Sequence, residues 1–103
     1  MAAEANNLAP WTAVPEDCAP HVRRYLTGLA YRSDLDLVAR EASAYARAAA
    51  AEHAGGAWVF DVDETLLYNL PYYAEHGYGL ELFDHREFDK WVEKGEAPAI
   101  PSS

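Results

Sequence analysis

The sequence contains one cysteine, Cys18, among 103 residues. A single cysteine cannot form an internal disulfide, so we read Cys18 either as half of a disulfide in a longer parent protein or as a small buried thiol. Basic residues are also scarce, with 8 Lys and Arg against 17 Asp and Glu, for a net charge of −9. Because nucleic-acid binding needs Lys and Arg to neutralise phosphates, the composition argues against a nucleic-acid partner.

Long apolar runs are missing as well. No segment approaches the roughly 20 apolar residues of a membrane span, so we predict no membrane partner. The opening MAAEANNLAPW has neither a basic start nor an apolar core, and it predicts no signal peptide. Half of the residues are hydrophobic, however, which is typical of a folded chain rather than a disordered one.

Proline, glycine and hydrophobic periodicity divide the chain into three parts. Residues 1–19 are predicted to be irregular because prolines interrupt them. Residues 20–54 carry two helical patterns, of which the first spans 20–28 and opens on a proline, a favourable first helical residue. Residues 55–103 hold an acidic motif and an aromatic region.

The second of these patterns and one later helix have clear boundaries in the sequence. The pattern at 34–54 places apolar residues three and four apart, with Ser33 as the expected N-cap and a glycine pair as the stop. The pattern at 85–94 follows Asp84, which we expect to cap it. The helix at 34–54 is predicted to be structural.

A short apolar run, AWVFD at 57–61, predicts a buried strand. Its hydrophobicity is continuous rather than alternating, which favours a parallel sheet covered on both faces. No second strand of this quality follows. Residues 68–83 are predicted to be an aromatic loop, and residues 95–103 an exposed connection.

The acidic triplet DVDE follows that strand. Asp61 and Asp63 are two residues apart, so in extended backbone their side chains point to the same side. Because two facing carboxylates repel each other, we expect a divalent cation between them, and oxygen ligands suit Mg²⁺. Thr65 is expected to bond back to the loop and hold its turn, and Asn69 either orders this loop or satisfies a turn. Glu64 is expected to alternate away from the pair into solvent, with a role as a third metal ligand as the alternative.

FDVDETLL resembles motif I of the haloacid dehalogenase superfamily, the DxDx(T/V) phosphatase signature. Over 11–103, the segments WVFDVDETLLYNLPYYAEHGYG and FDKWVEKGEAPAIPSS are similar to the plant acid phosphatase and vegetative storage protein family. The resemblance implies an α/β fold with a parallel sheet, of which this chain holds the N-terminal part. It also implies that the cap over the active site begins near Leu67.

Residue by residue, the resemblance implies that Asp61 is the nucleophile, which becomes phosphorylated, and also a metal ligand. It implies that Asp63 is the general acid and base, and that its backbone carbonyl reaches Mg²⁺. The expected substrate is a small phosphomonoester. Members of the family can dimerise and are typically secreted or vacuolar, although this sequence predicts neither an oligomeric state nor a compartment.

Three motifs of the family lie downstream of this sequence: a phosphate-binding Ser or Thr, a Lys and a second acidic pair. We therefore expect an inactive fragment of an acid phosphatase that is poorly stable alone. The alternative is a vegetative storage protein or a non-catalytic truncated product. A phosphoprotein phosphatase is a further possibility, which the aromatic segment argues against. The tyrosines at 72, 73 and 78 are predicted to pack in the core, with substrate contact as the alternative.

Overall fold

Two helices that meet at a glycine form the first half of the fold. The computed structural model describes residues 12–103. Helix α2 (Ala19–Thr27) confirms the first predicted helix, and α3 (Leu29–Glu52) follows it directly. A Cβ at Gly28 would lie 2.6 Å from the carbonyl oxygen of Arg24, so only glycine permits this break. The expected N-cap at Ser33 is wrong, because α3 begins at the Gly28 break and already includes Ser33.

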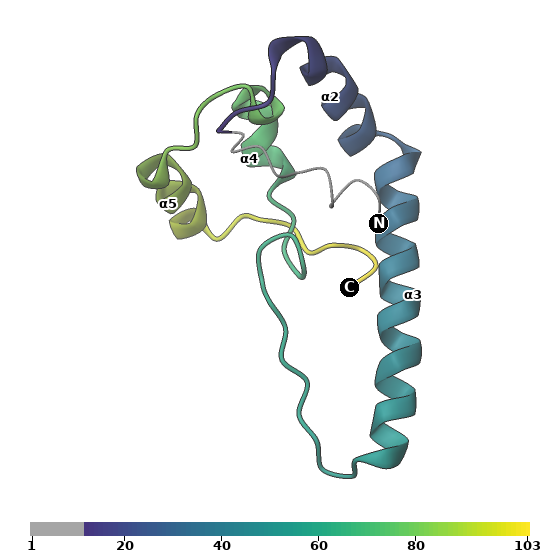
Figure 1. The fold of residues 1–103 in the computed structure, drawn as a ribbon. Coiled ribbons are helices and arrows are strands. Elements are labelled where there is room, and N and C mark those ends of the chain that lie inside the picture. Colours follow the sequence, from purple (N-terminus) through teal and green to yellow (C-terminus); the bar gives the residue numbers. More distant parts are fainter. Residues whose placement is uncertain (1–11) are drawn as a thin grey trace.

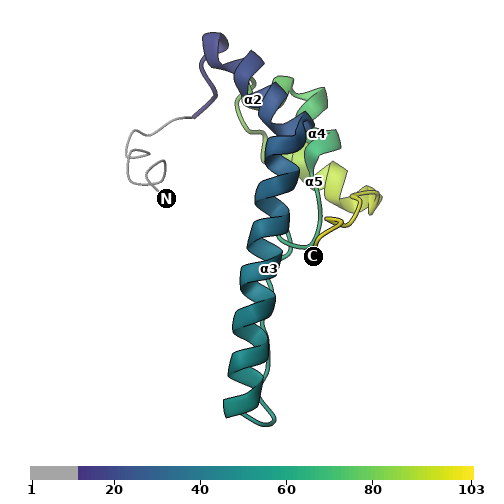
Figure 2. The same cartoon turned by 90° about the vertical axis from the view of Figure 1, so that its right-hand side faces the viewer.

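Helix α3 is a long rod, and residues 54–62 return along it (Figures 1 and 2). The rings of Tyr45 and Trp58 hold the two together, with centroids 6.0 Å apart. The predicted strand at 57–61 is wrong for the described residues, where this segment is extended but belongs to no ladder. A strand needs a neighbour for its backbone hydrogen bonds, and no described segment pairs with it. The predicted parallel sheet is therefore not formed within residues 12–103.

The aromatic region is helical rather than a loop, which corrects the prediction for 68–83. It contains α4 (Leu70–Glu75) and the 3₁₀ helix η2 (Gly77–Gly79), and another 3₁₀ turn, η1, precedes α2 at Glu16–Cys18. Pro71 lies in the first turn of α4, where its missing N–H removes no helical hydrogen bond.

Helix α5 (His85–Lys94) confirms the predicted boundaries. The Asp84 side chain accepts hydrogen bonds from the backbone N–H groups of Arg86 and Glu87, at 2.8 and 3.3 Å. Gly95 ends the helix with a φ of 63°, the left-handed conformation that glycine adopts readily.

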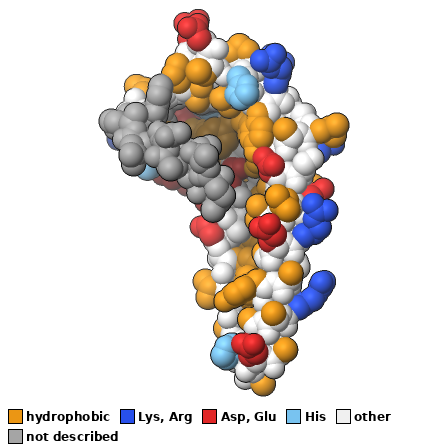
Figure 3. Space-filling view, turned by 45° about the vertical axis from the view of Figure 1, so that its right-hand side comes forward, with side chains coloured by type: hydrophobic (Ala, Val, Ile, Leu, Met, Phe, Trp, Pro, Cys, Tyr) orange, Lys and Arg blue, Asp and Glu red, His pale blue; other side chains and the backbone are white. Residues whose placement is uncertain are grey.

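The core is very small. Within the described residues only Tyr72, Ile100 and Asn69 are buried. The Tyr72 ring packs between α4 and α5, with the Phe88 centroid 5.1 Å away and the Trp91 centroid 6.4 Å away. The radius of gyration is 16.3 Å, against about 13 Å for a compact domain of 100 residues. Hydrophobic side chains therefore line the surface of the rod (Figure 3).

The C-terminal segment packs on the acidic motif, which corrects the prediction of an exposed connection. The backbone N–H of Tyr68 donates to the carbonyl oxygen of Pro98 at 2.8 Å. The backbone N–H of Ile100 donates to Leu66 O at the same distance. The Ile100 side chain is 3% exposed. The segment thus closes one side of the loop that follows Asp61.

The N-terminal end of the described chain lies against η2. The backbone N–H of Val14 donates to Gly79 O at 2.7 Å. Cys18 is exposed, so its interpretation as a buried thiol is wrong. Of the irregular segment predicted at 1–19, residues up to 11 lie outside the described part. Among the described helices, none combines the length and the apolar character that a membrane crossing requires.

Candidate active site

The acidic motif lies on a tight loop closed by its own backbone. The carbonyl oxygen of Val62 accepts hydrogen bonds from Leu66 N and Leu67 N, both at 2.9 Å, and from Thr65 N at 3.3 Å. Glu64 N donates in return to Leu67 O at 2.9 Å. These bonds force Glu64 to a φ of 59°, a left-handed conformation that is rare for a side chain of this kind. Such outliers cluster at functional sites, which makes this loop the first candidate.

Asp61 stands at the entry to this loop and is exposed. Its Oδ2 accepts a hydrogen bond from the Thr65 hydroxyl at 3.0 Å. The prediction that Thr65 bonds back to the loop is therefore confirmed. Asp61 Oδ1 has no hydrogen-bond partner among the described residues, so one oxygen of this carboxylate is oriented and the other is free.

Asp63 is held by a different partner. Its Oδ1 accepts a hydrogen bond from the side-chain Nδ2 of Asn69 at 2.9 Å. Asn69 is 2% exposed. Its Oδ1 accepts from the indole Nε1–H of Trp91 at 2.8 Å. The open question about Asn69 is thus answered: it orders the loop, and it connects the loop to α5.

Glu64 is exposed, as the sequence predicted, but it also has a structural contact. Its Oε1 accepts the backbone N–H of Asn69 at 3.1 Å, which ties the loop to the start of α4. Tyr31 of α3 lies close by, and its ring stacks on Tyr68 at 5.9 Å. Burial, followed by the negative charge of Glu64, raises the pKa of Tyr31 above its ordinary value.

Two structural roles escaped the sequence reasoning, those of Trp91 and of Glu64. The sequence analysis assigned no partner to the indole N–H of Trp91. An indole N–H on a packed face needs an acceptor, and Asn69 is a polar residue beside an apolar segment. The need of the indole N–H for an acceptor was therefore the feature of the sequence that could have predicted this contact. The contact of Glu64 with Asn69 depends on the left-handed backbone conformation of Glu64, which no residue pattern predicted.

The charges of Asp61 and Asp63 are compensated only by neutral donors. In the part of the chain that the structure covers, no Lys, Arg or His forms an ion pair with either of them. No group of three or more His, Cys, Asp and Glu side chains gathers there to hold a metal ion. The two aspartates thus offer oxygen ligands without a complete metal site, and the predicted Mg²⁺ site stays a prediction.

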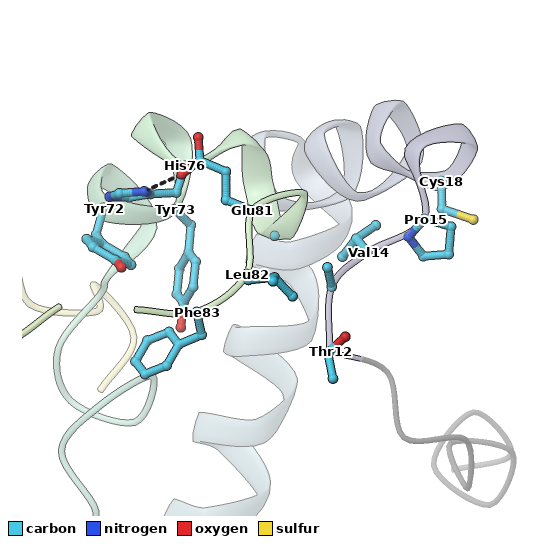
Figure 4. A pocket seen from close by; sticks show the side chains of 12 residues that line it. Thr12, Val14, Pro15, Cys18, Tyr72, Tyr73, His76, Glu81, Leu82 and Phe83 are labelled. Atoms are coloured by element: carbon cyan, nitrogen blue, oxygen red, sulfur yellow. Dashed lines mark hydrogen bonds and ion pairs between the residues drawn. The ribbon is translucent and has the colours of Figure 1, made fainter. Parts of the chain in front are cut away.

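One apolar cavity is separate from the aspartates. It has a volume of about 500 Å³ and lies between the N-terminal segment and the aromatic region (Figure 4). Tyr72, Tyr73, Leu82 and Phe83 give it apolar walls, and the Nδ1 of His76 lies 2.7 Å from Glu81 Oε2 at its edge. Asp61 and Asp63 do not line it. Tyr72 is buried, as predicted for the core, whereas Tyr73 and Tyr78 are only half-buried.

Comparison with known proteins gives consistent matches. The chain matches the family described as HAD superfamily, subfamily IIIB (Acid phosphatase), over residues 1–103. It is 54% identical to Acid phosphatase 1 of Solanum lycopersicum over 101 residues, which cover 97% of this chain and 40% of that protein.

Two further relatives have other names. The Stem 28 kDa glycoprotein of Glycine max is 42% identical over 103 residues, covering the whole chain and 40% of that protein. Vegetative storage protein 1 of Arabidopsis thaliana is 36% identical over 106 residues, covering the whole chain and 39% of that protein. The chain therefore spans about 40% of the length of the relatives it matches.

Proposed function

The chain belongs to the acid phosphatase subfamily IIIB of the HAD superfamily, and on that premise we propose that it carries the first catalytic loop of a phosphomonoesterase. The superfamily has an α/β fold, so residues 57–61 are proposed to become a sheet strand in the full-length protein. The proposed substrate is a small phosphomonoester. Asp61 is proposed as the nucleophile and Asp63 as the general acid and base.

The proposed reaction has two steps. In the first, a carboxylate oxygen of Asp61 forms a bond to phosphorus while the bond from phosphorus to the alcohol oxygen breaks, and protonated Asp63 gives its proton to that departing oxygen. In the second, Asp63 takes a proton from water as the water oxygen bonds to phosphorus. The bond from phosphorus to Asp61 then breaks, which releases phosphate and restores the Asp61 carboxylate.

One observation supports this division of roles most directly: the two carboxylates have different partners. Asp61 is oriented by the Thr65 hydroxyl within the loop, and its other oxygen is free among the described contacts. Asp63 is oriented by the Asn69 amide from outside the loop. A pair of acids in different environments is suited to different tasks in one reaction.

The residues present fit part of a Mg²⁺ site. Asp61 Oδ1 and the backbone carbonyl oxygen of Asp63 accept no hydrogen bond within the described residues, and both are the oxygen ligands that Mg²⁺ prefers. We propose that these two atoms contribute to holding the ion. The bound ion would neutralise phosphate charge, so that a protein with a net charge of −9 could accept an anionic substrate. The Asp63 side chain would remain available for proton transfer.

The test is Asp61→Asn in the full-length protein that contains this sequence. We expect loss of hydrolysis of a chromogenic phosphomonoester, because an amide cannot form the phosphorylated intermediate. Glu64→Gln is the matched control, since it makes the same chemical change at the neighbouring acid, and we expect it to retain most activity. Undiminished turnover in Asp61→Asn would refute the proposal.

The alternative is storage or a non-catalytic product, and the name of the Arabidopsis relative favours storage. The two can be distinguished with the 103-residue chain and the full-length protein, each incubated with Mg²⁺ and the same ester. We expect negligible hydrolysis by the short chain, because the resemblance places the other motifs downstream. Turnover by the full-length protein supports the enzyme, and inactivity of both supports the alternative.

A further inference from the structure

The most deeply buried polar side chain of the described residues, Asn69, is hydrogen-bonded on both of its side-chain atoms. It joins Trp91 of α5 to Asp63 of the acidic loop, and Trp91 lies 22 residues further along the chain. The backbone of Asn69 is also held, since its N–H donates to Glu64 Oε1 at 3.1 Å and its carbonyl accepts Tyr73 N at 3.1 Å. The residue therefore has little freedom to move.

The chemistry of the partners determines which way the amide points. An indole N–H can only donate, so it must face the amide oxygen of Asn69. The Trp91–Asn69 bond of 2.8 Å thus turns the amide Nδ2 toward Asp63, whose Oδ1 accepts from it at 2.9 Å. Because that oxygen already faces a donor, a proton carried by Asp63 has to be on Oδ2.

Trp91 is itself well fixed. Its ring lies on α5, with a centroid 6.4 Å from that of the buried Tyr72. The Asp84 cap sets where α5 begins, and the contact of Phe88 with Tyr72 at 5.1 Å holds the helix against α4. Helix α5 therefore supports the Asn69 amide that donates to Asp63 Oδ1.

We propose that Trp91 and Asn69 are positioning residues, which fix the side chain of Asp63 and present its Oδ2 to the leaving-group oxygen of the substrate. This inference rests on the proposed function, because it assigns the pair to the proton transfer. It adds a specific consequence: loss of the indole N–H should impair the first step, which kcat/KM reports, only where the leaving group needs a proton.

The first experiment compares two substrates in the full-length protein. An alkyl phosphate has a poor leaving group that needs protonation, whereas dinitrophenyl phosphate releases a stable anion that does not. We expect Trp91→Phe, which keeps an aromatic ring and removes the N–H, to lower kcat/KM for the alkyl ester about tenfold. For dinitrophenyl phosphate, kcat/KM should stay within about twofold of the wild type.

Trp58→Phe is the matched control, because the Trp58 indole makes no hydrogen bond among the described residues and its ring packs on Tyr45. We expect it to change the ratio of the two kcat/KM values by less than about twofold. An equal loss on both esters in Trp91→Phe would indicate a merely structural role. An unchanged rate with the alkyl ester would also overturn the proposal.

A second measurement does not depend on activity. The indole N–H signal of Trp91 is followed by NMR in the wild type, in Asp63→Asn and in Asp61→Asn. We expect Asp63→Asn to shift the Trp91 signal, because it changes the partner of the Asn69 amide, whereas Asp61→Asn leaves it in place because Asp61 bonds to Thr65.

The two measurements distinguish the possible failures. A full-length protein that hydrolyses neither ester refutes the proposed function, and with it the assignment of the pair to catalysis. If the Trp91 signal is the same in Asp63→Asn as in the wild type, the physical connection between Trp91 and Asp63 is refuted whatever the activity. If Trp91→Phe does not fold, the NMR comparison still decides, because it leaves Trp91 in place.

Discussion

The backbone N–H of Ile100 donates a hydrogen bond to the carbonyl oxygen of Leu66 at 2.8 Å. The next residue, Leu67, forms an antiparallel bridge with Ala99. The end of the described chain therefore lies directly against the loop that carries Asp61 and Asp63. Because Ile100 is one of the three residues that are buried in the described part of the chain, this segment contributes much of the small core.

We predict that Ile100→Ala in the full-length protein lowers the free energy of unfolding by about 2–5 kcal/mol, as expected when a buried aliphatic side chain is truncated. Urea denaturation of the two proteins measures this free energy. Leu82→Ala is the control, since Leu82 is 70% exposed and should change stability by about 0.5 kcal/mol or less. Equal effects of the two substitutions would contradict the assignment of Ile100 to the core.

Thr65→Val should reduce activity by removing the hydroxyl that orients Asp61, while the shape of the side chain is retained. A hydrogen bond to a charged group contributes about 1.5–3 kcal/mol, so we expect kcat/KM of the full-length protein to fall about tenfold or more. Thr27→Val makes the same change at a hydroxyl that bonds to Arg23 O on α2, and it should leave kcat/KM near the wild-type value. Steady-state kinetics with a chromogenic ester is the measurement, and wild-type kinetics in Thr65→Val would rule out this role of the hydroxyl.

The Tyr25 phenol should ionise only at an unusually high pH. It donates a hydrogen bond to Asp34, and this bond, followed by burial and the Asp34 charge, raises the pKa of Tyr25 from 10.0 to about 12. Because the pKa of Tyr25 is higher in the folded state, its interaction with Asp34 contributes to the stability of the fold. This contribution is fully present below pH 10 and is lost as the pH rises toward 12.

An ultraviolet titration of phenolate formation, wild type minus Tyr25→Phe, isolates this group. In Asp34→Asn the pKa of Tyr25 should move back toward its ordinary value, since the charged acceptor is gone. A Tyr25 titration that is the same with and without the Asp34 carboxylate would show that the pair does not set the pKa.

The 103-residue chain alone should unfold over a broad temperature range. Its described residues bury few side chains, and Val59 and Phe60 of the returning segment are 91% and 56% exposed. Small cores of this kind give little cooperative stability. Circular dichroism during heating is the measurement, and a sharp transition at high temperature would contradict the prediction.

Local features of the sequence determined α2 and α5. The aspartate and glycine that bound α5 act through bonds to their immediate neighbours, so no distant residue is needed to predict them. The acidic motif was also recognisable locally, because Asp61, Asp63 and Thr65 lie within five residues. The match over residues 1–103 confirmed the family resemblance.

Tertiary contacts decided the rest. Whether residues 57–61 form a strand depends on neighbouring strands, and the described chain supplies none. The C-terminal segment is part of the core, and it is held there by the hydrogen bond from the backbone N–H of Ile100 to the carbonyl oxygen of Leu66, 34 positions earlier. The Trp91–Asn69–Asp63 connection likewise joins groups far apart in sequence. Hydrogen bonds between residues far apart in the sequence depend on how the chain folds in space, and local propensity cannot predict them.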